Sequence, residues 1–444
     1  MSGYDAGAIG IIGGGVIGVT TAVTLRLLGY QTILYARVRP SFAPGVTRPA
    51  GFATLHAAAS VLPHSVSSPK VEAWTSVSQA FFRALWFRGC CGVRRQTHYE
   101  VFEDKVTVPP SYAGSVEDFT ALDGGHSPKR SGVDDVYGWK FNAFFCEAGD
   151  YIDFLYGFYA ALGGQMLDPP GHGSLPDYWS AGHVCLVNCA GLDAYALLAS
   201  AAADPLYRDE PDDGKFDRLM DPVPAKLIRG HTLRIDLGLV PEGEVFSYNY
   251  KPVVGVYQTD RGLPADVYCY PRAESWLLGG SRQEGLLDDR GVWVGEETRG
   301  EVIPFPAATG DPILIPAAIW RLNADLLSGM TQGRLDLERL VRDEPSIVAP
   351  GIGYRFVRDS PTDSVRVGAS RARYAGATRY ILHNYGHGGS GYTLSWGCGA
   401  DIARMIGPIM GPPFGADRAI WPRFSIGHGA TARLLSRVLE SQLV

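Results

Sequence analysis

The chain has 444 residues with 40 basic and 46 acidic side chains, a net charge of −6 and 46% hydrophobic residues. This composition is typical of a globular protein with more than one domain, and it excludes the strong positive charge of most nucleic-acid-binding proteins. No apolar run reaches the roughly 18 residues of a membrane span, and the apolar N-terminal segment has no basic leader before it. Neither a membrane span nor a secretory signal is therefore predicted.

The seven cysteines are scattered along the chain, are odd in number and include no C-x-x-C pair. This pattern favours a reducing compartment over a disulfide framework, and no metal centre is expected. The last residues, Gln442-Leu443-Val444, differ from a peroxisomal tripeptide of the Ser-Lys-Leu type. Cytoplasm is the expected location.

The N-terminal segment has the pattern of a dinucleotide-binding unit. Residues 8–12 form an apolar strand that leads into a G-x-G-x-x-G turn, Gly13-Gly14-Gly15-Val16-Ile17-Gly18. A helix is predicted over 16–28 and a second strand over 31–35. In this strand, turn and helix setting, the glycines allow a tight turn, access for a pyrophosphate and close packing of helix on sheet. A purely structural turn is the alternative.

The acidic residue that usually follows the second strand of such a unit is missing. It binds the adenosine ribose and lies about 20 residues beyond the glycines, but no acid occurs between Asp5 and Glu72. The strand is followed instead by Ala36 and Arg37. An arginine at this place favours a 2′-phosphate, so an NADP-dependent dehydrogenase is an alternative prediction.

The central part of the chain contains two further candidate cofactor turns. A loop over 39–48 leads to Pro49-Ala50-Gly51-Phe52-Ala53, and an apolar strand over 184–192 ends in Asn188-Cys189-Ala190-Gly191. Residues 57–140 show little periodicity apart from an aromatic helix over 74–87, which is predicted to pack in the core. An amphipathic helix begins at residue 151.

From about residue 226 the pattern changes to alternating strands over 232–236, 267–270 and 275–280, which predict a mostly antiparallel sheet. The segment from 284 to 343 is rich in proline and contains a predicted helix over 317–327. Its role as a lid or as a contact between subunits is an open expectation.

The C-terminal part contains the most specific motif. The run Ile381-Leu382-His383-Asn384-Tyr385-Gly386-His387-Gly388-Gly389-Ser390-Gly391 leads into a helix predicted over 393–406. Five glycines fall within residues 386–397, at the mouth of that helix. Bare backbone N–H groups beside a positive helix terminus form a cradle for an anion or a large cofactor.

These motifs together resemble the D-amino-acid oxidase family of flavoproteins, with Gly399 in place of the family's usual alanine. The resemblance covers about residues 8–56, 146–193, 226–285 and 344–408. It implies an α/β fold in which residues 1–60, 141–225 and 344–444 form a discontinuous Rossmann-type FAD-binding domain. Residues 61–140 and 226–343 would form the second, mostly antiparallel-sheet substrate domain.

The resemblance also implies which residues contact FAD. They come from the N-terminal turn, from the end of the second strand, from the central turns and from the C-terminal motif. The predicted cofactor-binding residues are Gly13, Gly15, Val16, Ile17, Gly18, Ala36, Arg37, Thr47, Ala50, Gly51, Phe52, Gly191, Gly386, His387, Gly388, Gly389, Gly391, Tyr392 and Thr393.

Three predicted substrate-binding residues follow from the resemblance. Arg355, in Gly353-Tyr354-Arg355-Phe356, would bind the substrate carboxylate through two parallel hydrogen bonds, and the hydroxyl of Tyr268 would reach the same group. The backbone carbonyl of Gly389 would accept a hydrogen bond from the substrate amine. Arg358 and Arg366 are expected to be surface or ion-paired residues. Pro264 occupies the place where some members have a lid tyrosine, so a different side-chain pocket is expected.

The implied reaction oxidises a D-amino acid, or a related cyclic or N-substituted amino acid, to an imine by hydride transfer to flavin. Oxygen would reoxidise the flavin and give hydrogen peroxide. Positioning alone drives such a step, and the sequence has no obvious His/Asp dyad. His383 and His387 are expected to be structural or to contact the flavin. A non-catalytic flavin-binding protein is an alternative, and a homodimer is possible.

Overall fold

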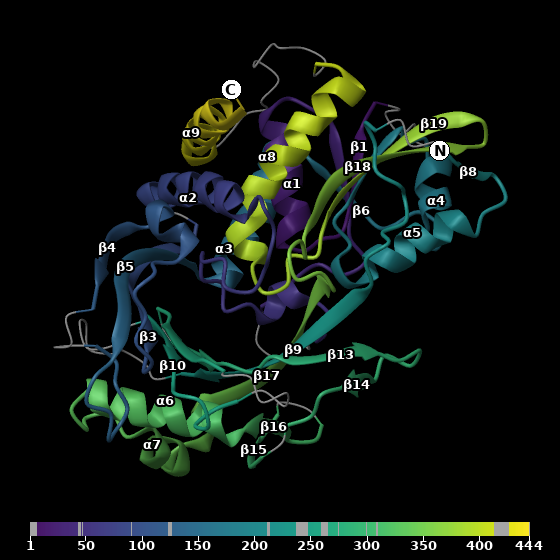
Figure 1. Ribbon diagram of the computed structural model, residues 1–444. Helices are drawn as coiled ribbons and strands as arrows, with labels where there is room; N and C mark the ends of the chain where they lie inside the picture. The colour runs from purple at the N-terminus through teal and green to yellow at the C-terminus, as the bar shows by residue number, and fades with distance from the viewer. Residues whose placement is uncertain are drawn as a thin grey trace.

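A computed structural model describes residues 7–42, 46, 48–89, 91–122, 127–210, 214–236, 247–258, 265–273, 275–298, 300–307, 310–412 and 426–443. These residues form two large sheets with helices packed on them, shown one above the other in Figure 1. None of the described helices has the length and apolarity that crossing a bilayer requires. The six cysteines in the described ranges are buried thiols that form no disulfide with one another.

The first sheet contains both ends of the Rossmann unit predicted from sequence. Its described strands run in the order β6 (Gln165–Leu167), β2 (Thr32–Tyr35), β1 (Ile9–Ile12), β7 (Cys185–Asn188), β19 (Ala377–Tyr385), β18 (Arg366–Tyr374) and β8 (Tyr207–Asp209). The first five are parallel, and β18 and β8 add antiparallel pairs at one edge. The C-terminal motif therefore follows a strand two places from β1.

Helices cover both faces of this sheet, which explains why its parallel strands are apolar throughout. Along β1, Ile11 packs into one core and Ile12 into the other. Five helices share the first core: α1 (Val16–Leu27), α2 (Val71–Arg88), α3 (Ala148–Ala161), α8 (Gly391–Met410) and α9 (Ile426–Leu443). The second core contains α4 (Leu175–Ser180) and α5 (Ala194–Ala202), which lie on the other side in Figure 1.

The second sheet is mostly antiparallel and contains the predicted substrate strands. Its order is β14 (Trp293–Gly295), β13 (Gln283–Leu287), β9 (Ala225–Ile235), β12 (Trp276–Gly279), β11 (Val267–Pro271), β10 (Ser247–Lys251), β3 (Val93–Phe102), β5 (Tyr137–Cys146) and β4 (Glu117–Ala121), with β17 (Val348–Arg358) also paired to β9. Short 3-10 turns lie between the main elements: η1 (Ala53–His56), η2 (Ser111–Ser115), η3 (Gly191–Asp193) and η4 (Pro345–Ile347).

Several features of the chain's organisation differ from the sequence prediction. The stretch from 57 to 140 contains β3, β4 and the start of β5 in addition to α2. These strands escaped prediction because polar residues in β3 interrupt the apolar alternation. In addition, β17 lies in the second sheet, beyond the domain boundary expected at residue 344, and α2 packs in the first core although residues 61–140 were assigned to the substrate domain.

The segment from 284 to 343 begins with β13 and β14 of the second sheet, and its later part packs on the far face of that sheet. It contains the hairpin β15 (Val302–Phe305) and β16 (Ile313–Pro316), and the helices α6 (Ala317–Met330) and α7 (Leu337–Asp343). Ile319, Leu326 and Leu327 of α6 are buried in one core with Tyr248 and Leu278 of the sheet. Figure 1 shows α6 on the side of this sheet away from the first sheet. The later part of the segment therefore forms a structural layer. No described residue of 284–343 lines the cavity, which does not support a lid, and a contact between subunits stays a prediction.

A buried ion pair fastens the end of β17 to the loop before β9. Asp221 accepts hydrogen bonds from Arg358 Nε at 2.7 Å and from the Tyr385 hydroxyl at 3.0 Å, and Arg366 lies 3.8 Å away. The expectation that Arg358 and Arg366 are ion-paired is confirmed. Burial acts to raise the pKa of Asp221, but the hydrogen bond from Arg358 and the two arginine charges outweigh it, so the pKa lies below its ordinary value.

We expect Asp221→Asn to lower the free energy of unfolding by about 2–3 kcal/mol at neutral pH, because it removes the charge that both arginines face. The folded-state pKa is depressed, so this stability is fully present above the unfolded pKa of about 3.9 and is lost as the pH falls through the folded value. Urea unfolding at several pH values measures it. A difference between the two proteins that stays constant down to low pH would contradict this account.

Candidate active site

A cavity of about 730 Å³ lies between the two sheets and is lined by residues from both. The first sheet supplies the N-terminal glycine turn and the C-terminal motif, and the second supplies side chains from β9, β10, β11 and β17. Sequence segments from the two ends of the chain therefore face one space.

The N-terminal turn has the backbone geometry expected of a phosphate-binding loop. Gly13 has φ of +120°, a conformation that favours glycine, and a Cβ at that position would overlap the carbonyl oxygen of Cys189. A Cβ at Gly18 would overlap the carbonyl oxygen of Gly13. The first turn of α1 has no acidic residue and its N-cap, Gly15, has no side-chain hydrogen bond. The positive end of this helix is thus directed to the cavity wall without a competing anion.

The C-terminal motif lies directly beside this turn. A Cβ at Gly391 would be 3.6 Å from Val16 Cγ1, so the start of α8 and the start of α1 meet. Gly386 has φ of +87°. Two buried polar atoms of the motif, His387 Nε2 and Asn384 Oδ1, have no hydrogen-bond partner among the described residues, and both side chains line the cavity. Unsatisfied buried polar atoms at a cavity wall are typical of a site that binds a polar ligand.

The two histidines of the motif are uncharged. Burial lowers the pKa of His387 to about 3 and holds the pKa of His383 well below its ordinary value. His383 Nε2 is 2.8 Å from the Ser370 hydroxyl on the neighbouring strand. This arrangement suits structural and cofactor-contacting roles.

The cavity contains most, but not all, of the predicted cofactor residues. Lining residues are Gly13, Gly15, Val16, Ile17, Arg37, Gly51, Phe52, Gly191, Gly386, His387, Gly388, Gly389, Gly391 and Tyr392. Gly18, Ala36, Ala50 and Thr393 lie behind this surface. The Thr393 hydroxyl donates to the carbonyls of Ser60 and Leu62, and the Ala50 carbonyl accepts from Tyr354, so both hold loops in place. Thr47 falls outside the described residues.

Arg37 has an acidic neighbour that the sequence pattern did not reveal. Its guanidinium lies 3.8 Å from the Asp193 carboxylate, and both side chains are more than 60% exposed. Asp193 comes from η3, far along the chain, and also lines the cavity. The positive charge that favoured a 2′-phosphate is therefore partly offset. The acid missing after β2 has a spatial counterpart.

Arg355 lies on β17 of the second sheet and lines the cavity. Its Nη1 donates to the Ser281 carbonyl at 3.3 Å, and no carboxylate among the described residues forms an ion pair with it. A Cβ at Gly230 would overlap the Arg355 guanidinium, so glycine on β9 makes space for this side chain. Burial lowers the pKa of Arg355, but a guanidinium remains charged at neutral pH. A half-buried cation without a counter-ion faces the cavity.

Tyr268 lies near this cation, on β11. Its hydroxyl makes no hydrogen bond to any described residue, and its ring stacks on Tyr270 with centroids 4.7 Å apart. A Cβ at Gly279 on β12 would overlap the Tyr268 hydroxyl. Burial raises the pKa of Tyr268, which keeps the phenol protonated as a donor. A Cβ at Gly389 would lie 3.3 Å from Arg355 Cδ, so all three predicted substrate residues face one end of the cavity.

Comparison with known proteins agrees with this geometry. The sequence profile described as "FAD dependent oxidoreductase", the DAO family, matches residues 8–405. This chain belongs to the DAO family of FAD-dependent oxidoreductases. The NADP-dependent alternative is set aside, because the family uses FAD.

The relatives of this oxidoreductase include named amino-acid oxidases. A D-amino-acid oxidase from Rubrobacter xylanophilus is 24% identical over 402 residues, 90% of this chain and 96% of that protein. Human D-aspartate oxidase is 22% identical over 411 residues, 90% of this chain and 95% of that protein. The resemblance inferred from the motifs is confirmed.

Solved structures of FAD-dependent oxidoreductases share the fold. Glycine oxidase from Geobacillus kaustophilus has a TM-score of 0.55 and 15% identity, over 90% of this chain and 94% of that chain. An L-α-glycerophosphate oxidase from Mycoplasma pneumoniae, solved with FAD bound, has a TM-score of 0.54 and 13% identity with the same coverage. The predicted fold class is confirmed.

The residues of this flavoprotein fit the cofactor. The glycine turn at the start of α1 suits the pyrophosphate, and the crowded glycines of the C-terminal motif leave bare backbone where a ring system can approach. The unsatisfied atoms of His387 and Asn384 lie at the same wall. FAD would therefore be held between the starts of α1 and α8.

Several residues near Arg355 and Tyr268 were not predicted from the sequence. Gly230 and Gly279 leave space for the side chains of Arg355 and Tyr268. Two further pairs line the cavity: Asp266 with Arg282, and His64 with Asn249. Strand register brings them together across β9 to β12 and from the loop before α2. Polar residues at alternate positions of a predicted strand are the sequence signal that could have indicated a cavity-facing side.

Proposed function

We propose that this flavoenzyme oxidises a D-amino acid, or a related cyclic or N-substituted amino acid, to the corresponding imine. The observation that carries the proposal is the unpaired guanidinium of Arg355 at the cavity wall, beside the free hydroxyl of Tyr268. A planar guanidinium binds a carboxylate through two parallel hydrogen bonds and so sets its orientation. The substrate would therefore carry a carboxylate next to the reacting carbon.

The side chains and backbone of this end of the cavity would position the substrate. Arg355 and Tyr268 would hold the carboxylate, and the Gly389 carbonyl would accept a hydrogen bond from the amine. With the carboxylate and the amine both held, the orientation of the Cα–H bond is also set. Bound FAD supplies the hydride acceptor, and reoxidation by oxygen would yield hydrogen peroxide. A flavin kept only as a structural ligand would have no use for a carboxylate-binding arginine in the cavity.

The first test of the proposal is optical. We expect the purified protein to be yellow and to release FAD on denaturation, because both glycine motifs line one cavity. Anaerobic addition of a D-amino acid should bleach the visible flavin band, since the electrons then remain on the cofactor. The measurement is a visible spectrum before and after each addition. Protein that contains FAD but is not reduced by any amino acid would overturn the proposed reaction while leaving the family assignment intact.

A further inference from the structure

A row of polar side chains crosses the cavity face of the second sheet, away from the carboxylate-binding residues. Asn249 of β10 is in register with Tyr268 of β11 on one side and with Glu100 of β3 on the other. Residues in register on neighbouring strands point to the same face. Because neighbouring strands lie about 4.8 Å apart, the backbone of Glu100 is roughly 10 Å from that of Tyr268.

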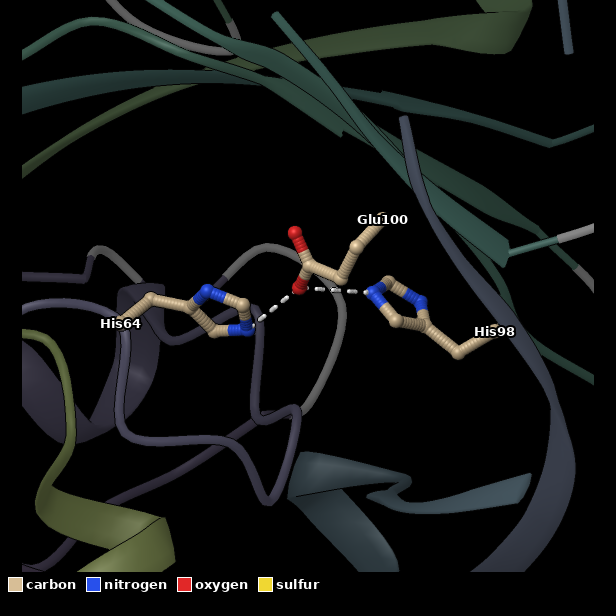
Figure 2. Close-up of side chains that lie close together, drawn as sticks. All are labelled: His64, His98 and Glu100. Atoms are coloured by element: carbon tan, nitrogen blue, oxygen red, sulfur yellow. Dashed lines mark hydrogen bonds and ion pairs between the residues drawn. The ribbon is translucent and has the colours of Figure 1, made fainter. Parts of the chain in front are cut away.

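Glu100 is 6% exposed and lies at the centre of a converging cluster. Its Oε1 is in hydrogen-bond contact with His98 Nε2 at 3.3 Å, the Tyr112 hydroxyl at 3.2 Å and Asn249 Nδ2 at 3.1 Å, and His64 Nε2 lies 3.1 Å away. Figure 2 shows both imidazole rings directed at this one oxygen. Burial raises the pKa of Glu100 and the hydrogen bonds from Tyr112 and Asn249 offset this only in part, so a positive charge placed nearby would favour the ionised form.

None of these donors supplies a full positive charge. Burial lowers the pKa of His98 to about 3 and the pKa of His64 below its ordinary value, so both rings are neutral at neutral pH. Arg282 and Asp266, which both interact electrostatically with Glu100, are paired with each other at 3.3 Å. A buried carboxylate without a counter-charge is unfavourable. His64 and Asn249 separate it from the cavity, which both of them line.

We propose that the cavity wall formed by His64 and Asn249, with Glu100 behind it, binds a positively charged nitrogen group at the end of the substrate side chain. This inference rests on the proposed function. A substrate whose carboxylate is held at Arg355 and Tyr268 lies one strand spacing from Asn249 and two from Glu100, so a side chain as long as that of lysine can reach the wall. The bound cation would supply the missing counter-charge of Glu100.

The test compares two substrates of the same shape, D-lysine and uncharged D-norleucine, by anaerobic reduction of the bound flavin. We expect D-lysine to reduce the flavin of the parent enzyme more efficiently, as the reduction rate constant divided by Kd. We expect Glu100→Gln to lower the value for D-lysine by at least about 30-fold, as removal of one buried charge partner does, with little change for D-norleucine. Glu103→Gln is the matched control, because the Glu103 carboxylate is paired with Arg130 and lies outside the cavity lining.

Equal use of D-lysine and D-norleucine by the parent enzyme, or a preference for D-aspartate, would overturn the charge site while leaving the proposed oxidation in place. Failure of every amino acid to reduce the flavin would overturn both. The donor atoms of His64, His98 and Glu100 lie within 4.8 Å of one another, a spacing that also suits a divalent metal ion. A stoichiometric metal in the purified protein that Glu100→Gln loses would assign the cluster to metal binding and overturn the proposal.

Discussion

Replacing Arg355 by Leu should lower kcat/KM by about a hundredfold or more, equivalent to roughly 3 kcal/mol of transition-state binding. The reason is the charge state of the cavity: Arg355 has no ion-pair partner among the described residues, so a substrate carboxylate meets a cation that is not already engaged. Arg355→Lys keeps the charge but loses the two-pronged geometry, and should retain weak activity. The measurement is steady-state kinetics with the best D-amino acid found.

Flavin content separates this effect from damage to the fold. Arg355 belongs to β17 of the second sheet, whereas the glycine turn at the start of α1 belongs to the first, so FAD occupancy should barely change in either variant. Arg88→Leu, at the exposed end of α2, controls for the loss of one positive charge. If Arg355→Leu oxidises its substrate as well as the parent does, the carboxylate contact is wrong. The substrate should then be sought among amines without an acid group.

Replacing Gly389 by Val should weaken FAD binding by about 2 kcal/mol or more, roughly thirtyfold in Kd. Its φ is not positive, so the expected effect is steric. A Cβ there would already lie 2.9 Å from the Ser65 hydroxyl oxygen, and valine adds two methyl groups beyond it. Gly15→Val should behave similarly, because its Cβ would be 3.0 Å from Thr54 Oγ1. Titration of the flavin-free protein with FAD gives Kd directly.

A glycine remote from the cavity provides the comparison. Gly157 is exposed on α3 with no atom within 4 Å of an added Cβ, so Gly157→Val should bind FAD as the parent does. Circular dichroism establishes that each variant is folded. Full flavin occupancy in both Gly389→Val and Gly15→Val would show that these positions do not contact the cofactor.

The glycine motifs and buried strands of this chain could be predicted without a structure because they depend on the backbone conformation and burial of neighbouring residues. A turn such as Gly13 to Gly18 requires glycine at fixed spacing, and the apolar runs of β1 and β19 reflect burial on both faces. Those features were sufficient to predict the Rossmann unit, its cofactor and the family. The start of α8 was placed two residues late, since the glycines that begin it are poor helix formers.

The strands of the second sheet were harder to predict because polar residues occupy positions that face the cavity. In β3, His98 and Glu100 occupy inward positions where an apolar residue would signal a buried face. Their partners are His64 from a loop and Asn249 from a parallel neighbour, which strand pairing brings together across long sequence separations. The periodicity of the sequence does not indicate contacts between residues so far apart in the chain.

The sequence by itself determined the fold family and the cofactor, because glycine spacing and apolar runs report backbone conformation and burial at each position. Tertiary structure alone decided which charges in the cavity are paired. At the cavity wall Asp193 offsets Arg37 and Asp266 pairs with Arg282, whereas no described carboxylate forms an ion pair with Arg355; outside the lining, Asp221 pairs with Arg358. Coulomb interaction depends on distance in space, and distance between residues far apart in the chain is set by how the sheets pair.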